Sequence, residues 1–243
     1  MNILILAAGS EQSTTENAYP LCLTEFDSAP LIQRVINACR PLAPKKLMVL
    51  FREEDVRRYH LDNVVTLLFP AAKIVRIHGQ TQGAACTALL AVGECDNDEE
   101  LLILNGNEFL DADFFEIVGG FRGRGLDGGV VVFPSVHPRY SYVRLDDSGC
   151  VVEASEKNPI SHHATAGFYW FKHGSEFVRG AMNLIRKDAQ VNGRFYICPT
   201  FNELILRGLT IGVHSINAKV YHPLKDERQV RQFEKAAEKG SEI

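Results

Sequence analysis

Short apolar runs alternate with longer segments of helical periodicity through the first half of this chain. Four of the runs predict strands, at residues 2–7, 46–51, 73–77 and 101–104. The segments between them predict helices, at residues 30–39, 53–69 and 83–92. Strands separated by helices pair in parallel and are covered on both faces. The alternation therefore predicts an α/β fold with a doubly wound, mostly parallel sheet.

The pattern changes after about residue 127, where turns separate short strands. The segment from Asp146 to Gly149 predicts a hairpin turn. Further strands are expected at 129–133, 142–145, 151–154, 164–171 and 210–216, and further helices at 175–187, 199–207 and 227–239. No repeat, Pro-rich linker or low-complexity segment marks a boundary. The sequence therefore predicts one domain over residues 1–243.

Charge balance and cysteine spacing exclude several classes of protein. The 243 residues include 26 basic and 30 acidic side chains, without the cluster that a nucleic-acid groove requires. The six cysteines form no CxxC pair, so we expect reduced thiols and no zinc site. The apolar start, MNILILAAG, lacks a preceding basic region and predicts a strand, not a signal peptide. No apolar stretch approaches the ~20 residues of a membrane span, and we expect a cytoplasmic protein.

Two small-residue segments follow predicted strands and suit a nucleotide. Residues 6–9 (LAAG) follow the first strand, where small side chains let backbone N–H groups approach a base and phosphates. Residues 81–85 (TQGAA) begin a helix. There Gly83 leaves room for a planar base, and the amide of Gln80 or Gln82 can read its edge. The structural alternatives are a tight turn and close packing of the helix on the sheet.

A third segment, residues 105–111 (NGNEFLD), follows the fourth strand. Ligands of open α/β sheets bind at the carboxyl ends of strands, and a carboxylate there can hold Mg²⁺. Asp111 and Asp113 stand where a helix would begin, so capping that helix is their expected role.

A fourth segment, residues 155–159 (SEKNP), forms a loop that ends in proline. Lys157 in this loop can grip a phosphate, and Gly167 in the next strand indicates close approach of a ligand. Taken alone, an exposed pair such as Glu156 and Lys157 would indicate no function.

Together and in this order, the four segments resemble the sugar-phosphate nucleotidyltransferases, especially bacterial members linked to capsule and surface-polysaccharide synthesis. The likeness covers nearly the whole chain and is strongest in EKNPIS, ATAGFYWFKHGSEFVRGA and NGRFYICPTFNELILRG. It implies a Rossmann-like, glycosyltransferase A-type fold. Residues 1–126 would form the nucleotide-binding half and residues 127–243 the sugar-phosphate-binding half. Members of this family join a nucleoside triphosphate to a sugar 1-phosphate or a related phosphate and release pyrophosphate.

The resemblance also assigns roles to individual residues. Those assigned to the nucleotide are Leu6, Ala7, Ala8, Gly9, Gln82, Gly83 and Gly106. Those assigned to the sugar phosphate are Lys157, Gly167 and Asn202, with Lys157 and Glu156 as catalytic residues. Magnesium would be held by Asn107 and Glu108. The implied partners are a nucleoside triphosphate or nucleotide sugar and a sugar phosphate. Whether the protein forms a homo-oligomer stays open. We expect one pocket at the carboxyl ends of the strands, with Gly9 and Gly106 on the same side.

Several reactive positions depart from the family pattern. Glu11 stands where the loop has its second Gly, Ser13 where it has Arg, and Leu21 where a Lys follows the Pro. Asn107 replaces the metal-binding Asp, and residues 222–227 (HPLKDE) replace a later Asp and Gly-Thr-Pro. Phosphoryl transfer relies on such cations to neutralise developing charge, so we expect slow or undetectable turnover. The nearest substitute cations that the sequence offers are Arg139, Arg144 and Arg194.

Two other functions stay open beside a nucleotidyltransferase, although the sequence favours an enzyme. One is a non-catalytic homologue that binds a nucleotide or sugar, or regulates a partner enzyme. The other is a nucleotide-sugar-dependent glycosyltransferase, which requires Asp-x-Asp at the end of a strand. Asp111-Ala112-Asp113 has those letters but reads as a helix start. A dinucleotide-binding enzyme is disfavoured, because no GxGxxG follows Leu6.

Overall fold

The computed structural model describes residues 1–9, 20–26 and 28–223. The strands are β1 (Asn2–Leu6), β2 (Glu25–Phe26), β3 (Ala29–Pro30), β4 (Lys46–Arg52), β5 (Lys73–Ile77), β6 (Leu101–Asn105), β7 (Glu108–Leu110), β8 (Gly128–Pro134), β9 (Ser141–Leu145), β10 (Val151–Glu156), β11 (His163–Phe171), β12 (Ile211–Ser215) and β13 (Tyr221–Pro223). The helices are α1 (Leu31–Cys39), α2 (Glu53–Tyr59), α3 (Leu61–Leu68), α4 (Ala84–Leu89), α5 (Val92–Cys95), α6 (Phe114–Gly123), α7 (Gly174–Arg186) and α8 (Thr200–Ile205). Three short 3-10 helices are η1 (Leu21–Leu23), η2 (Arg40–Leu42) and η3 (Ala218–Val220).

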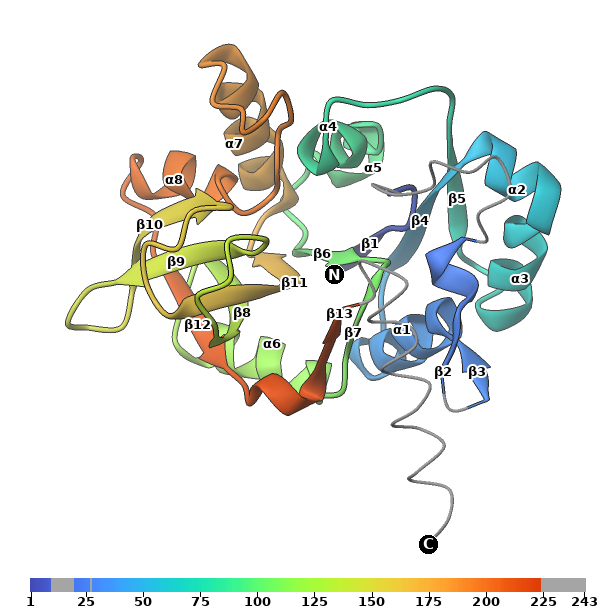
Figure 1. Cartoon of the computed structure of the whole chain (residues 1–243), viewed down its shortest axis with the longest axis horizontal. Helices are drawn as coiled ribbons and strands as arrows, with labels where there is room; N and C mark the ends of the chain where they lie inside the picture. Colours follow the sequence, from blue (N-terminus) through green and yellow to red (C-terminus); the bar gives the residue numbers. More distant parts are fainter. Residues whose placement is uncertain (10–19, 27, 224–243) are drawn as a thin grey trace, which may run out of the picture.

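A nine-stranded mixed sheet forms the centre of the molecule (Figure 1). Its main path runs β10-β9-β11-β6-β1-β4-β5, while β8 pairs with β11 and β12. The four strands β6, β1, β4 and β5 pair in parallel, as their helical connections require. β11 joins β6 in the antiparallel direction, so residues from both halves of the chain build one sheet.

Helices cover both faces of the sheet and bury two apolar clusters. One cluster lies under α1, α3 and α6, and the other under α4, α7 and α8. Figure 1 shows the same division, with α4, α5 and α7 on one side of the central strands and α1 and α6 on the other. All five residues of β1 are buried, because this central strand contacts both clusters. The predicted doubly wound α/β architecture is confirmed.

Most predicted elements are present, with two differences. The helix expected at 53–69 is two helices, because His60 adopts a left-handed backbone with φ of 53° and interrupts the hydrogen-bond ladder. The helix expected at 83–92 ends at Leu89, and α5 follows it. The strands of the second half are largely antiparallel. The helix expected at 227–239 lies outside the described residues.

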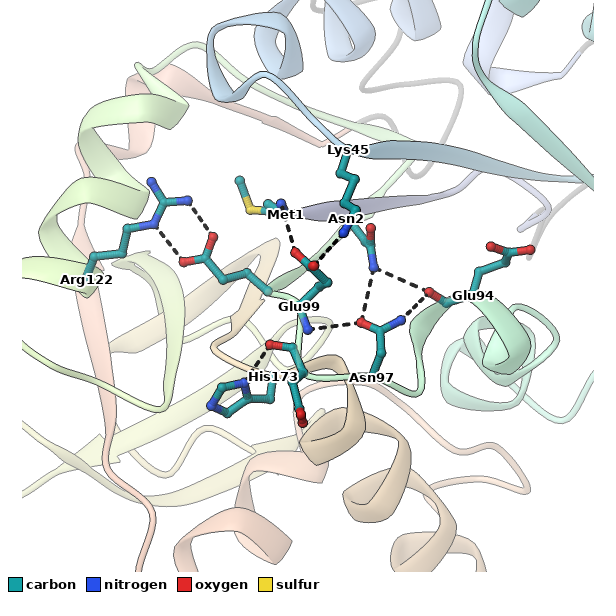
Figure 2. Close-up of polar contacts among 10 residues, drawn as sticks. Met1, Asn2, Lys45, Glu94, Asn97, Glu99, Arg122 and His173 are labelled. Atoms are coloured by element: carbon teal, nitrogen blue, oxygen red, sulfur yellow. Dashed lines mark hydrogen bonds and ion pairs between the residues drawn. The ribbon is translucent and has the colours of Figure 1, made fainter.

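The amino ends of the parallel strands are joined by a polar network (Figure 2). The amide of Asn2 donates to the carbonyl of Glu94 at 3.3 Å and to the side-chain oxygen of Asn97 at 3.4 Å. The Glu94 carboxylate accepts from Lys46 at 2.6 Å and from Lys73 at 2.5 Å, at the starts of β4 and β5. This network occupies the amino edge of the sheet. The opposite, carboxyl edge is not part of it.

Cysteine pairing and helix length can be stated for the described residues. All six cysteines are free, and burial raises the pKa of Cys22 to about 12, so its thiolate does not form near neutral pH. No helix in the described part of the chain is long and apolar enough to cross a bilayer.

We expect the Glu94→Gln variant to lose less folding stability than wild type does as the pH falls through the acid range. Hydrogen bonds from Lys46 and Lys73 lower the pKa of Glu94 from 4.5 to about 2. Because the folded pKa lies below the unfolded one, the stabilisation is present above about pH 4.5 and is lost as the pH falls towards 2. Urea midpoints across the acid range, at low salt, test this, with the exposed Glu116→Gln as the control. A difference between wild type and Glu94→Gln that does not change with pH would contradict it.

Candidate functional site

The central strands β1 and β6 end side by side at the carboxyl edge of the sheet. Leu6 pairs with Asn105, and the N–H of Gly106 donates to the carbonyl of Leu6 at 2.8 Å. A Cβ on Gly106 would lie 2.8 Å from the Cα of Ala7, so only glycine fits this approach. Ala7 precedes Gly9 by two residues. Gly9 and Gly106 therefore lie on the same side of the molecule, as predicted.

Arg52 joins this edge from the neighbouring strand, and the sequence analysis did not identify it. The N–H of Ala7 donates to the carbonyl of Leu50 at 3.0 Å, which continues the pairing of β1 with β4. Two residues later, Nε of Arg52 donates to the carbonyl of Ala8 at 2.9 Å. A guanidinium thus holds the turn at 7–9. In the sequence, Arg52 is recognisable only as a basic residue directly after an apolar strand. No local sequence pattern indicates its contact with Ala8.

Gly83 lies against the backbone of a distant segment. Its φ is 106°, and a Cβ there would lie 2.4 Å from the carbonyl oxygen of Phe195. Phe195 donates to the carbonyl of Gln82 at 2.8 Å and accepts from the N–H of Ala85 at 3.0 Å. Gly83 thus packs closely against the loop segment at Phe195, whereas the alternative considered from the sequence was close packing of the helix on the sheet. The base-reading role of Gln82 and Gly83 stays a prediction.

Lys157 reaches the residue next to Phe195. Its Nζ donates to the hydroxyl of Tyr196 at 2.9 Å and lies 5.1 Å from the centre of that ring. The backbone of Lys157 is left-handed, with φ of 55°, and its N–H donates to the carbonyl of Tyr140. The segment 195–196 thereby connects the Gln82–Gly83 turn to Lys157. The sequence analysis did not identify Tyr196 as a partner of Lys157, because the two residues lie 39 positions apart.

Two other residues assigned to the sugar phosphate and to catalysis contact the protein itself. The Glu156 carboxylate is buried and accepts a hydrogen bond from the Ser141 hydroxyl. The Asn202 amide donates to the carbonyl of Ala154 and accepts from its N–H, both at 2.8 Å. Asn202 therefore fastens α8 to β10. Ligand-binding roles for Glu156 and Asn202 stay predictions.

Gly167 makes room for a carboxylate of the protein. A Cβ at Gly167 would lie 1.9 Å from Oε2 of Glu108, an oxygen that also accepts from Nδ2 of Asn105 at 3.2 Å. Glu108 is only 6% exposed. Burial, together with this nearby carboxylate, raises the pKa of Tyr221 well above its ordinary value. The glycine that predicted close approach of a ligand thus has a structural partner within the protein.

The described residues do not form a magnesium site of their own. No group of three His, Cys, Asp or Glu side chains in this part of the chain is placed to hold a metal ion. The Glu108 carboxylate lies between Asn105 and Gly167, and Asn107 offers a neutral amide. Mg²⁺ prefers carboxylate and phosphate oxygens, so this donor set does not fit a cage built by the protein. The assignment of Mg²⁺ to Asn107 and Glu108 stays a prediction.

The positions that depart from the family pattern are only partly visible. Glu11, Ser13 and residues 224–227 lie outside the described residues. Leu21, which stands in place of a lysine, is half-buried at the start of η1. Among the candidate substitute cations, Arg144 pairs with Glu153 at 2.5 Å.

The other two candidate cations lie near aromatic or backbone partners. The Arg139 guanidinium lies 4.9 Å from the centre of the Tyr140 ring. Arg194 precedes Phe195, and its backbone pairs with Val191. Of the three arginines, Arg194 is therefore the one next to the segment that contacts Gln82.

A cavity of about 310 Å³ lies between α1 and β7. Its lining residues are Ala29, Arg34, Asn37, Ala38, Phe109, Leu110, Asp111 and Ala112. None of them is a predicted site residue. Asp113, just beyond it, accepts hydrogen bonds from the N–H groups of Phe115 and Glu116, so its predicted capping role is confirmed.

Comparison with protein families identifies this arrangement. The family described as nucleotidyl transferase matches residues 4–188, well over half of the chain. The chain belongs to this nucleotidyl transferase family. The match includes the Ala7–Gly9 turn, the Gln82–Gly83 turn and Lys157. Comparison with curated protein sequences gives no significant match.

Several solved structures share the fold of this nucleotidyltransferase. A nucleoside-diphosphate-sugar pyrophosphorylase from Vibrio cholerae RC9 is 22% identical, with a TM-score of 0.81 over 96% of this chain and 99% of its own. A UDP-glucose pyrophosphorylase in complex with UDP-glucose is 12% identical, with a TM-score of 0.77 over 98% of each chain. A Bacillus anthracis protein provisionally assigned as a glucose-1-phosphate thymidylyltransferase is 16% identical, with a TM-score of 0.74 over 97% of this chain and 94% of its own. The expected family and fold are confirmed.

We expect Gly167→Ala to destabilise the protein more than Gly125→Ala does. Both glycines have a φ of 64°, but a Cβ at Gly125 would meet no atom within 4 Å. The left-handed backbone alone should cost about 1–2 kcal/mol at each site. The overlap with Glu108 should add about 1–3 kcal/mol at Gly167. Chemical denaturation measures both losses, and equal losses would show that Glu108 is not confined beside Gly167.

Proposed function

We propose that this protein transfers a nucleotidyl group from a nucleoside triphosphate to a sugar phosphate, at the carboxyl edge of its sheet. The observation that carries the proposal is two sets of contacts between segments that are distant in sequence. The Ala7–Gly9 turn contacts Gly106, and the segment 195–196 links the Gln82–Gly83 turn to Lys157. The nucleotide and the sugar phosphate would lie across these segments. The resemblance to capsule-type members further suggests a cytoplasmic role in surface-polysaccharide synthesis.

The proposed reaction forms one bond and breaks one. A phosphate oxygen of the sugar phosphate attacks the α-phosphorus of the triphosphate, and the bond from that phosphorus to the bridging oxygen breaks. Pyrophosphate leaves with the electron pair, and the product is a nucleoside diphosphate sugar. Lys157 is suited to hold the phosphate of the sugar, because an ammonium group forms strong charge-assisted hydrogen bonds to phosphate oxygens. Tyr196 would orient that ammonium through its hydroxyl and ring.

The rate of this reaction should be low. Positioning and electrostatic neutralisation supply nearly all of phosphoryl-transfer catalysis, and loss of one donor typically reduces the rate by ~10²–10³. In this chain Ser13 and Leu21 stand in place of an arginine and a lysine. Members of the family typically depend on a divalent metal. Because the described residues lack a site for one, we propose that Mg²⁺ enters as part of the triphosphate complex.

A non-catalytic homologue that binds the same ligands is the second candidate function. The neutral residues at the reactive positions favour it, and binding without turnover would identify it. The glycosyltransferase alternative is weaker, because Asp113 caps α6 and Asp111 lines the cavity beside α1. Neither carboxylate of that Asp-x-Asp is at the edge where β1 and β6 end.

We expect pyrophosphate release well below the ~10 s⁻¹ typical of enzymes. The assay pairs each nucleoside triphosphate with a panel of sugar 1-phosphates, with and without Mg²⁺. Thermal shifts measured in parallel report binding, since a ligand at 100 times its dissociation constant adds about 2.7 kcal/mol of stability. Turnover near 10 s⁻¹ for any pair would show that other residues neutralise the phosphates. Absence of both binding and turnover would contradict the proposed function.

We expect Lys157→Ala to weaken binding of a sugar phosphate by roughly tenfold or more, through loss of a charge-assisted contact. Tyr196→Phe should weaken it less, because the ring still faces the ammonium. Lys45→Ala is the control, since Lys45 pairs with Glu99 in the network at the opposite edge. Isothermal titration calorimetry measures all three variants. Unchanged affinity in Lys157→Ala would show that this residue does not contact the ligand.

A further inference from the structure

Glu108 lies next to the position at which the family carries its metal-binding aspartate, and protein atoms enclose its carboxylate. The preceding residue, Asn107, occupies that position in this chain. Glu108 is only 6% exposed, and its Oε2 accepts a hydrogen bond from Nδ2 of Asn105 at 3.2 Å. The same oxygen fills the space beside Gly167, where a Cβ would lie 1.9 Å from it. The carboxylate is therefore held between the end of β6 and the middle of β11.

The strand β13 lies close to this carboxylate as well. In the short sheet of β13 and β7, Pro223 pairs with Glu108 and Tyr221 pairs with Leu110. The Tyr221 side chain is buried, and burial together with the Glu108 carboxylate raises the pKa of its hydroxyl well above the ordinary value. The phenol therefore keeps its proton beside the carboxylate. Because β6 and β7 belong to the first half of the chain and β11 and β13 to the second, Glu108 connects the two halves.

The space beside the carboxylate does not suit a hydrated cation. The cavity there has a volume of about 10 Å³, and a single water molecule needs at least about 10–15 Å³. Besides Asn105, Glu108 and Gly167, its lining consists of apolar residues of the cluster under α1 and α6, namely Val35, Leu104, Leu110, Phe114, Ala166 and Phe168. Mg²⁺ demands octahedral coordination by oxygen and gives up its water molecules reluctantly. This small apolar space cannot supply those ligands.

We propose that Glu108 connects the two halves of the chain through its carboxylate and does not bind a divalent cation. Asn107 carries a neutral amide where the family pattern has a carboxylate. The neighbouring carboxylate is already engaged by Asn105 and packed against Gly167. A cation would then reach the site on the phosphates of the nucleotide, and this part of the proposal rests on the proposed function.

Chemical denaturation of single and double variants tests the structural part. Gly167→Ala should cost less stability in the Glu108→Ala background than in wild type, because the oxygen that overlaps the new Cβ is gone. The remaining cost should match that of Gly125→Ala, whose Cβ would meet no atom. Glu108→Asp, which withdraws the carboxylate from Gly167, gives the same comparison if Glu108→Ala does not fold. Equal costs of Gly167→Ala in every background would contradict the proposal.

Titration of the free protein with Mn²⁺ tests the metal part, with the electron paramagnetic resonance signal of unbound Mn²⁺ as the readout. Glu108→Gln should bind Mn²⁺ as wild type does. The control is Glu116→Gln, which removes an exposed carboxylate and should also match wild type. A saturable Mn²⁺ site in wild type that is lost in Glu108→Gln and kept in Glu116→Gln would overturn the proposal.

A further metal measurement uses the nucleotide. Calorimetry compares the affinity of each nucleoside triphosphate for wild type and Glu108→Gln, in the presence of Mg²⁺ and of EDTA. The gain in affinity from Mg²⁺ should agree between the two proteins within about twofold, because Glu108 does not contact the cation. A clearly smaller gain in Glu108→Gln refutes the proposal and leaves the proposed function intact. Failure of wild type to bind any triphosphate refutes the proposed function, and the denaturation and Mn²⁺ measurements then decide the role of Glu108.

Discussion

The parallel pairing of β1 between β4 and β6 is the constraint on which the rest of the structure depends. Because all three strands point the same way, their carboxyl ends meet at one edge. The Ala7–Gly9 turn, Arg52 and Gly106 therefore lie close together at this edge. The opposite edge is closed by the polar network around Asn2 and Glu94, which ties the strand starts to α5. One set of backbone hydrogen bonds thus fixes both the core and the position of the site.

Three glycines show how tightly distant segments of the chain meet at that edge. Gly106 lies against Ala7, Gly83 against the backbone of Phe195, and Gly167 against the carboxylate of Glu108. In each case the space that a Cβ would take is filled by protein atoms. These close backbone contacts therefore serve first to hold the carboxyl edge of the sheet together. A ligand would bind to a surface that these contacts have already fixed.

The sequence predicted the elements better than the contacts between them. The strands at 2–7 and 46–51 were readable because β1 and most of β4 are buried on both faces, which demands continuous apolar runs. The break at His60 was not readable, because a left-handed non-glycine residue has no local signature. The contact of Arg52 with Ala8 spans 44 residues, and no periodicity reports a pairing at that separation. Likewise, Gly83 and Gly167 were recognisable as special positions, but the groups that require them lie far away in sequence.

The residues that form the apolar core differ from the positions at which the family carries its reactive charges. This difference explains how the chain can keep the fold while its reactive positions change. The apolar clusters and the strand pairing lie beneath the carboxyl edge. The family pattern has cations at reactive positions where this chain has Ser13 and Leu21, and phosphoryl transfer depends on such charges, so we expect their replacement to slow the reaction. The fold then limits which residues can place a positive charge at the carboxyl edge in place of the family's arginine and lysine. Arg52 lies on β4 next to the turn, and Lys157 is held by Tyr196 on a segment that contacts the start of α4.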